Sequence, residues 1–174
     1  MVNQPFGAAT VYPVNDTPAD KATYRFFLTA PKSLTTLANG DFAGKVTKGG
    51  LTTTRWEMRQ PMASELSMLT IGKYDVISGR TSTGIPNLTA TDRALGISPA
   101  LGREFHDQTA LIQDFLATKF GKYPFTSTGG VVVRANIGYA LETQARSIYD
   151  RAHAPGTLPS RTTIAHELAH QWYG

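Results

Sequence analysis

At 174 residues and 41% hydrophobic content, the chain is long and apolar enough to bury a sizeable core, which argues against intrinsic disorder. Its 17 basic and 13 acidic residues give a net charge of +4 that is spread along the sequence, so no nucleic-acid partner is expected, and no apolar run approaches membrane-spanning length. There is no cysteine, so a disulfide framework is excluded and a bound metal would need histidine and carboxylate ligands.

Residues 1–76 have the composition of β structure. Residues 22–30 alternate and are rich in β-formers, which predicts a strand buried largely on both faces. An Asn-Gly pair at 39–40 marks a turn, and a Gly-Gly pair at 49–50 predicts a hairpin. Residues 65–71 are expected to return to strand, so the region suits an antiparallel sandwich or meander.

The pattern changes after a boundary that we place at residues 73–76. Residues 77–98 have the Gly, Pro, Ser and Thr content of a loop. Apolar residues at three- and four-residue steps then predict a helix over residues 99–120. Gly121 is expected to stop this helix, and His106 to lie on its polar face.

Short strands and a loop are expected to follow before a final helix. Three consecutive valines at 131–133 predict a buried strand, and residues 137–143 predict another. Residues 155–160 are expected to form a loop, and Ser160 or Thr162 is the expected N-cap of the last helix.

The last nine residues have the pattern H-E-x-x-H-x-W-x-G. His166 and His170 would lie about one helical turn apart on the same face, so their imidazoles can hold one zinc ion. Glu167 would be close enough to take a proton from a water on that zinc without being a ligand. The alternative is an exposed helix with two solvated histidines, but Leu168 and Trp172 supply an apolar face that can hold the helix still.

Together with this pattern, three further stretches resemble the M1 family of zinc aminopeptidases. One of them, GYALETQ at 138–144, is similar to a bacterial variant of the family's exopeptidase motif, which is usually written G-x-M-E-N. In chain order the four stretches are YPVND at 12–16, PM at 61–62 followed by IGKY at 71–74, GKYPF at 121–125 followed by GYALETQ at 138–144, and the terminal zinc motif at 166–174.

The resemblance implies an α+β fold in two parts. Residues 1–75 would be the C-terminal part of the family's N-terminal β domain, an antiparallel β-sandwich portion. Residues 76–174 would be the first part of a thermolysin-like mixed α/β catalytic domain, truncated after the zinc helix. The chain is therefore expected to be an internal slice of a larger enzyme.

The resemblance also implies the metal and its chemistry. Zinc would be bound by His166 and His170, with Glu167 as the catalytic base. The family's third ligand is a Glu well downstream of the second histidine, and residues 171–174 contain none. We therefore expect the chain as given to lack the third ligand and peptidase activity.

The implied substrate is a peptide with a free N-terminus. Glu142 would pair with its ammonium group, whereas the alternative is a strand-edge glutamate in solvent. Gly138, Tyr139 and Ala140 would form an edge strand that pairs with the substrate backbone. Gln4 aligns loosely with a residue that touches the substrate amine.

Two other functions remain open from the sequence. One is a thermolysin-like zinc endopeptidase that shares only the zinc helix. The other is a non-catalytic metal-binding or interaction module. Independently of function, exposed strand edges are expected to let the chain self-associate.

Overall fold

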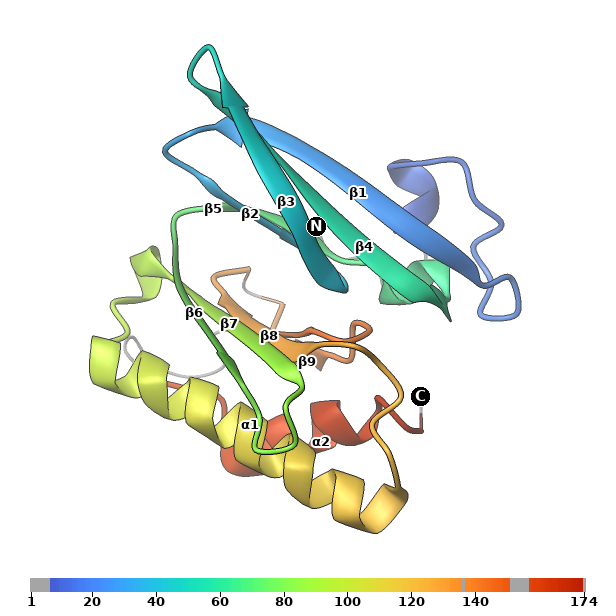
Figure 1. Cartoon of the computed structure of the whole chain (residues 1–174), viewed down its shortest axis with the longest axis vertical. Coiled ribbons are helices and arrows are strands. Elements are labelled where there is room, and N and C mark those ends of the chain that lie inside the picture. The colour runs from blue at the N-terminus through green and yellow to red at the C-terminus, as the bar shows by residue number, and fades with distance from the viewer. Residues whose placement is uncertain (1–6, 136, 151–156, 174) are drawn as a thin grey trace. The chain divides into compact units, whose positions relative to one another are not determined.

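The computed structural model describes residues 7–135, 137–150 and 157–173, and the chain divides into two compact units, Met1–Gly72 and Lys73–Gly174 (Figure 1). The first unit is built from antiparallel strands, and the second combines a mixed sheet with two α-helices. The α+β class predicted from the sequence is therefore confirmed. Among the described residues, neither α-helix is long and apolar enough to cross a membrane.

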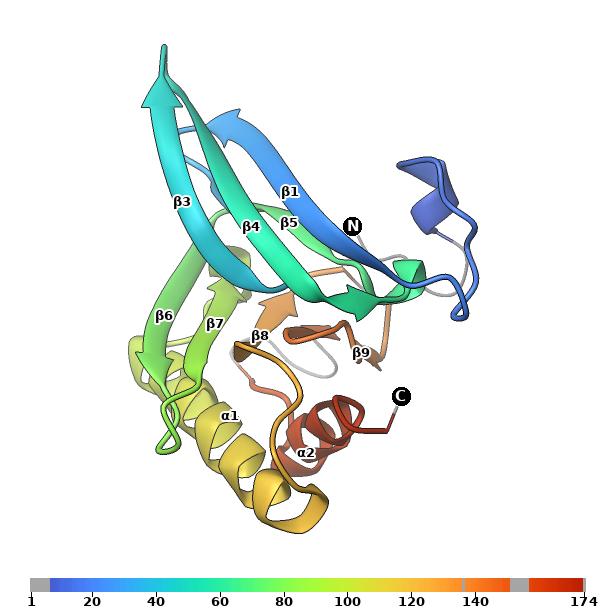
Figure 2. The ribbon, with the colours of Figure 1, turned by 45° about the vertical axis from the view of Figure 1, so that its right-hand side comes forward.

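The first unit contains a three-stranded sheet in the order β1-β4-β3 and a two-stranded ladder of β2 and β5, all antiparallel (Figure 2). The edge strands of the larger sheet are β1 and β3, and self-association through such edges stays a prediction. The elements are η1 (Ala8–Thr10), β1 (Ala22–Pro31), β2 (Thr35–Ala38), β3 (Asp41–Lys48), β4 (Leu51–Met62), η2 (Ser64–Leu66) and β5 (Leu69–Gly72).

The predicted hairpin at the Gly-Gly pair is confirmed. Lys48 pairs with Leu51 across the turn, and Gly49 and Gly50 have φ values of 58° and 82°. Positive φ at both central residues is the signature of a type I′ turn, whose twist matches that of the flanking strands. Two glycines allow this turn without steric strain.

Burial on β1 differs from the prediction of a strand buried on both faces. Tyr24, Phe26 and Leu28 are half-buried, whereas Phe27, between them in the sequence, is 63% exposed. The strand lies in a sheet that the β2–β5 ladder covers on one side, so only every second side chain faces the packed side. The alternation of half-buried and exposed residues was not recognised in the sequence because the exposed position 27 is also aromatic.

The region predicted as strand over residues 65–71 is strand only from Leu69. The region begins instead with the 3-10 helix η2. The buried side chain of Asn39 forms hydrogen bonds with backbone groups of this region, which a strand would otherwise use for pairing. The Asn39 Oδ1 atom accepts from the Met68 amide at 2.6 Å, and its Nδ2 donates to the Leu66 carbonyl at 3.0 Å. A tertiary contact therefore overrides the local strand propensity.

The second unit contains a five-stranded sheet in the order β6-β7-β8-β10-β9. The inner pairs, β7 with β8 and β8 with β10, are parallel, and the outer pairs are antiparallel. The elements are β6 (Tyr74–Arg80), β7 (Pro86–Asp92), η3 (Arg93–Leu95), α1 (Pro99–Phe120), β8 (Thr128–Val133), β9 (Ala140–Leu141), β10 (Ser147–Asp150) and α2 (Arg161–Ala169).

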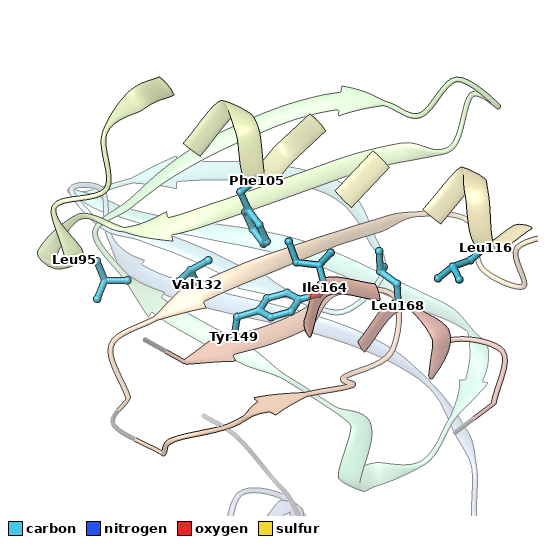
Figure 3. Packing of buried hydrophobic residues seen from close by; sticks show 7 residues of the cluster. All are labelled: Leu95, Phe105, Leu116, Val132, Tyr149, Ile164 and Leu168. Carbon is cyan, nitrogen blue, oxygen red and sulfur yellow. The ribbon is translucent and has the colours of Figure 1, made fainter. Parts of the chain in front are cut away.

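A hydrophobic cluster joins the two helices to the sheet (Figure 3). Phe105 of α1 is fully buried and makes an edge-to-face contact with Tyr149 of β10, with ring centroids 5.5 Å apart. Ile164 and Leu168 of α2 enter the same cluster. Burying each such side chain contributes about 1.5–3 kcal/mol, so the zinc-motif helix is anchored by its apolar face.

In this unit one loop prediction and one strand prediction are wrong. Residues 77–98 were expected as loop but supply most of the β6–β7 hairpin, since β7 pairs on both edges and its threonines and alanine are buried. The expected strand over 137–143 shrinks to the two residues of β9. The strand β10 was not expected, because four residues that are all buried show no alternation. The valine strand β8 is confirmed.

The helix α1 has the predicted bounds and ends. The Ser98 hydroxyl accepts from the Leu101 amide, Pro99 occupies the first turn, and Gly121 ends the helix with a φ of 91°. The last helix is capped by Ser160, whose hydroxyl accepts from the Thr163 amide at 3.1 Å, which decides between the two N-cap candidates.

His106 is buried in α1, not on its polar face as expected. Its Nδ1 lies 2.9 Å from the Thr89 hydroxyl, and its backbone carbonyl accepts from the side-chain Nδ2 of Asn87. Burial holds the pKa of His106 below its ordinary value, the positive charge of Arg103 lowers it further, and Asp107 opposes both. The histidine is therefore neutral in the native state.

This buried histidine predicts sensitivity to acid. Because the folded-state pKa is below the unfolded one, the stability that His106 contributes is complete above its unfolded pKa and is lost as the pH falls toward the folded value. Urea unfolding at pH 7, 6 and 5 should show a smaller loss of stability in His106→Gln than in the wild type. Parallel pH profiles for the two proteins would contradict this assignment.

Candidate metal centre

The two histidines of the terminal motif meet on one side of α2. His166 lies in the last turn of the helix and is exposed, and His170 follows as the C-cap with helical φ and ψ of −57° and −20°. Their Nε2 atoms are 3.1 Å apart, and their ring planes are inclined by 81°. Two nitrogens bound to one tetrahedral zinc lie about 3.3 Å apart, so this pair fits a metal without moving the helix.

The other ring nitrogen of His170 is placed to favour the tautomer that a metal on Nε2 requires. Its Nδ1 lies 3.2 Å from the Tyr173 carbonyl oxygen, to which it can donate a hydrogen bond. A donor proton on Nδ1 leaves the lone pair on Nε2 for a metal. The interpretation of two solvated histidines on an unattached helix is less consistent with this geometry.

Glu167 points away from solvent, although its two histidine neighbours are accessible. The residue is 5% exposed, and its Oε2 atom has no hydrogen-bond partner among the described residues. Burial raises the pKa of Glu167 to about 7, the negative charge of Glu142 raises it as well, and His170 lowers it. A carboxylate that titrates near neutral pH can both accept and return a proton.

Glu142 comes directly after β9, the outer strand of the five-stranded sheet. It is half-buried, and its charge acts on Glu167 across the space between the sheet and α2. Two carboxylates that are 25 positions apart in the sequence therefore interact electrostatically, and one of them, Glu167, adjoins His166 in α2. This proximity distinguishes Glu142 from an isolated glutamate at a strand edge.

A cavity of about 510 Å³ opens beside the start of α2. Its lining includes Gly138, Tyr139 and Ala140 together with Ser160 and Thr163 of the last helix. Tyr139 is 53% exposed at the cavity, and Ala140 is half-buried. The three predicted substrate-strand residues therefore border a space large enough for an amino-acid side chain.

The Asp150 carboxylate fixes the chain that leads into this cavity. One of its oxygens accepts from the Ala135 amide at 3.0 Å and the other accepts from the Gly138 amide at 2.8 Å. Asp150 is buried at the end of β10, so Ala135 and Gly138 are both held by this strand of the sheet. Sequence reasoning missed this residue because its partners lie 12 and 15 positions away.

Gln171 is a second residue that sequence reasoning missed. Its Oε1 accepts from the Ala145 amide at 2.7 Å, and its Nε2 lies 3.3 Å from the Glu142 carbonyl and 3.4 Å from the Glu167 carbonyl. The only sequence signal was its place directly after His170, which by itself indicates no partner.

One expected site residue and the expected third ligand are not placed by the described structure. Gln4 lies outside the described residues, so its expected contact with a substrate amine stays a prediction. Within the described part of the chain, no three His, Cys, Asp or Glu side chains gather to hold a metal. A third protein ligand would therefore have to come from outside the residues described.

Comparison with known proteins finds similarity to M1 peptidases over most of the chain. Residues 3–66 match the Peptidase M1 N-terminal domain. Aminopeptidase M1 of Arabidopsis thaliana is 25% identical over 181 residues, which cover 98% of this chain and 20% of that protein. Glutamyl aminopeptidase of Homo sapiens is 26% identical over 184 residues, which cover 99% of this chain and 19% of that protein.

A solved structure has a matching fold. A mutant of an M1 zinc metallopeptidase from Deinococcus radiodurans, bound to a Tyr-ser-ala substrate, superposes with a TM-score of 0.82 at 26% identity. The match covers 98% of this chain and 39% of that one. The two described units therefore share their fold with that metallopeptidase, and the chain spans about a fifth of the length of the curated relatives, 20% and 19%.

Proposed function

Because this chain belongs to the M1 family of zinc metallopeptidases, we propose that the protein is a zinc aminopeptidase that releases N-terminal residues from peptides with a free α-amine. The observation that carries the proposal is the grouping of the two histidines, Glu167 and Glu142 within one unit. A zinc endopeptidase needs the first three residues, and an enzyme that selects free N-termini also needs a carboxylate such as Glu142.

His166 and His170 would hold the zinc through their Nε2 atoms, whose separation suits it. When bound, zinc would polarise the scissile carbonyl and lower the pKa of a water. Completing the site would require a ligand from outside the described residues. The expectation that residues 1–174 alone are inactive stays a prediction.

Glu167 would move the proton. Its buried carboxylate can take a proton from the attacking water and return it to the nitrogen of the leaving amine. Its buried Oε2 atom accepts no hydrogen bond from the described residues, so this oxygen is available to accept the proton of the water. General acid–base catalysis of this kind contributes about 10²–10⁴-fold to the rate.

Glu142 would bind the substrate ammonium group. A charge-assisted hydrogen bond to ammonium recognises a free N-terminus and leaves an acylated or internal nitrogen without a match. The outer strand beside it would receive the substrate backbone. Because β10 is the one strand that pairs with β9 among the described residues, Tyr139 and Ala140 can accept an extended peptide as an added strand.

The test compares a free-amine substrate with its N-acetylated form, using zinc-loaded protein expressed from its complete reading frame. We expect the free-amine substrate to be hydrolysed much faster than its N-acetylated form, and we expect Glu142→Ala to lower kcat/KM for the free-amine substrate by about 10- to 150-fold, since a contact to a charged group is worth about 1.5–3 kcal/mol. Glu104→Ala, on an exposed position of α1, is the matched control.

Three outcomes would contradict the proposal in different ways. Equal rates on the two substrates would indicate an endopeptidase. Absence of turnover with zinc bound would indicate a non-catalytic metal-binding module. An equal loss on every substrate in Glu142→Ala would show that Glu142 has a structural role.

A further inference from the structure

The side-chain amide of Gln171 joins two parts of the site that are far apart in the sequence. Gln171 is 7% exposed. Its Oε1 accepts from the Ala145 amide at 2.7 Å, and its Nε2 is placed to donate to the carbonyls of Glu142 and Glu167 at 3.3 and 3.4 Å. One buried amide thus contacts the segment after β9 at two points and α2 at a third.

The segment that Gln171 contacts has an unusual backbone. Ala145 has a φ of 63° and is the one non-glycine residue with positive φ among those described. An L-residue adopts this left-handed conformation at a cost of about 1–2 kcal/mol, so surrounding contacts must hold it. The short hydrogen bond from the Ala145 amide to Gln171 is such a contact.

The other end of the same side chain is fixed to the metal-binding helix. Gln171 follows His170 directly, and its own amide donates to the Leu168 carbonyl at 3.1 Å. The last turn of a helix frays unless its groups find partners. Gln171 therefore ties the end of α2, with the second histidine, to the backbone that carries Glu142.

We propose that Gln171 is a positioning residue that sets the distance between the amine-binding carboxylate of Glu142 and the metal pair. This inference rests on the proposed aminopeptidase function. Removing the Gln171 amide would release the segment over residues 142–145 while leaving both imidazoles and the Glu142 carboxylate chemically intact. An anchoring group that is misplaced by about 1 Å can cost up to about 10²-fold in rate.

The test uses Gln171→Met, which keeps the shape of the side chain but removes its donor and acceptor. The matched control is Gln113→Met, since Gln113 is fully buried in α1 and its amide atoms have no partner among the described residues. We expect the ratio of kcat/KM for the free-amine over the N-acetylated substrate to fall at least about tenfold in Gln171→Met. Gln113→Met should keep the wild-type ratio.

A double variant distinguishes positioning from a general structural role. In a Glu142→Ala background the amine-binding carboxylate is absent, so its position no longer matters. Adding Gln171→Met should then cause no further change in the ratio of kcat/KM for the free-amine over the N-acetylated substrate. Additive effects would overturn the inference, as would an equal loss on both substrates. If Gln171→Met does not fold, Gln171→Glu replaces it, because a carboxylate still accepts from Ala145 but lacks both donors.

Amide hydrogen exchange gives a readout that needs neither zinc nor activity. In residues 1–174, the Ala145 amide should exchange at least about tenfold faster in Gln171→Met than in Gln113→Met. Unchanged protection would refute the link between Gln171 and this segment. If the wild-type protein shows no preference for a free amine, the proposed function fails and the positioning role fails with it, while exchange still decides whether the link exists.

Discussion

Glu167→Gln is expected to lower turnover by about 10²–10⁴-fold, because it removes the group that accepts the proton of the attacking water. Glutamine has the same shape, and the helix α2 is held by Ile164 and Leu168, so the fold should not change. Zinc affinity should also stay the same, since the proposed ligand atoms are the imidazole nitrogens of His166 and His170. The measurements are steady-state kinetics and calorimetric zinc titration on the same preparation.

Stability provides an independent check on this variant. The wild-type carboxylate is buried, and its Oε2 atom has no partner among the described residues, which costs free energy when the group is charged. Glu167→Gln should therefore unfold at an equal or higher urea concentration than the wild type at pH 8. Loss of activity together with retained stability is the behaviour of a residue placed for function.

The control and the contradicting result follow from the same reasoning. Glu104→Gln makes the same chemical change at an exposed position on α1 and should leave turnover unaltered. If Glu167→Gln retained turnover within about fivefold of the wild type, Glu167 would not be the general base, because even the low end of the expected effect is about 10²-fold.

The parts of the site that the sequence predicted are those defined by local geometry. The placement of His166 and His170 on one helix face was predicted because a four-residue spacing on a helix brings two side chains together, and their Nε2 atoms lie 3.1 Å apart. The bounds of α1 were found for the same reason, since its apolar period and its caps at Ser98 and Gly121 are read within one segment.

The parts that the sequence did not predict depend on contacts between distant segments. The raised pKa of Glu167 requires the charge of Glu142 and a buried environment, neither of which is visible in the motif. The role of Gln171 requires knowing that Ala145 and Glu142 lie against the end of α2. The strand β10 was missed because its burial on both faces leaves no alternation to recognise.

Polar content misled the assignment of one strand, and aromatic content misled the prediction of burial in another. Residues of β7 such as Thr89 and Thr91 are buried in the sheet, although Ser, Thr and Gly in this region favoured a loop. Phe27 is exposed, although its aromatic ring favoured burial. In each case the sheet neighbours, not the residue type, decide the environment.

A backbone contact in the centre of the second unit predicts the largest effect on stability. Gly129 lies in β8 and pairs with Leu88 of β7. A Cβ atom at Gly129, whose φ is 157°, would lie 1.9 Å from the Leu88 carbonyl oxygen. Because that oxygen belongs to the backbone of the neighbouring strand, the clash cannot be relieved by rotating a side chain.

Gly129→Ala is therefore expected to lower the free energy of unfolding by more than about 4 kcal/mol, the range that diagnoses a disrupted core or strained backbone. Such a loss is a large share of the roughly 5–15 kcal/mol that holds a domain together. Gly84→Ala is the matched control, since Gly84 also has a positive φ, 88°, but a Cβ there would meet nothing within 4 Å. The control should lose only about 1–2 kcal/mol, from the left-handed backbone alone.

Urea unfolding followed by tryptophan fluorescence and by far-UV circular dichroism measures both variants, in a Trp56→Phe background so that the fluorescence comes from Trp172 alone. Trp172 packs against Tyr123 and Phe120 in the second unit, with ring centroids 5.3 and 5.8 Å away, so its fluorescence reports on that unit. Because β8 lies between β7 and β10, its loss should also release β10 and the segment that carries Glu142. Equal stability of Gly129→Ala and Gly84→Ala would show that the strands can move apart, and that the close approach of β7 and β8 does not hold this sheet together.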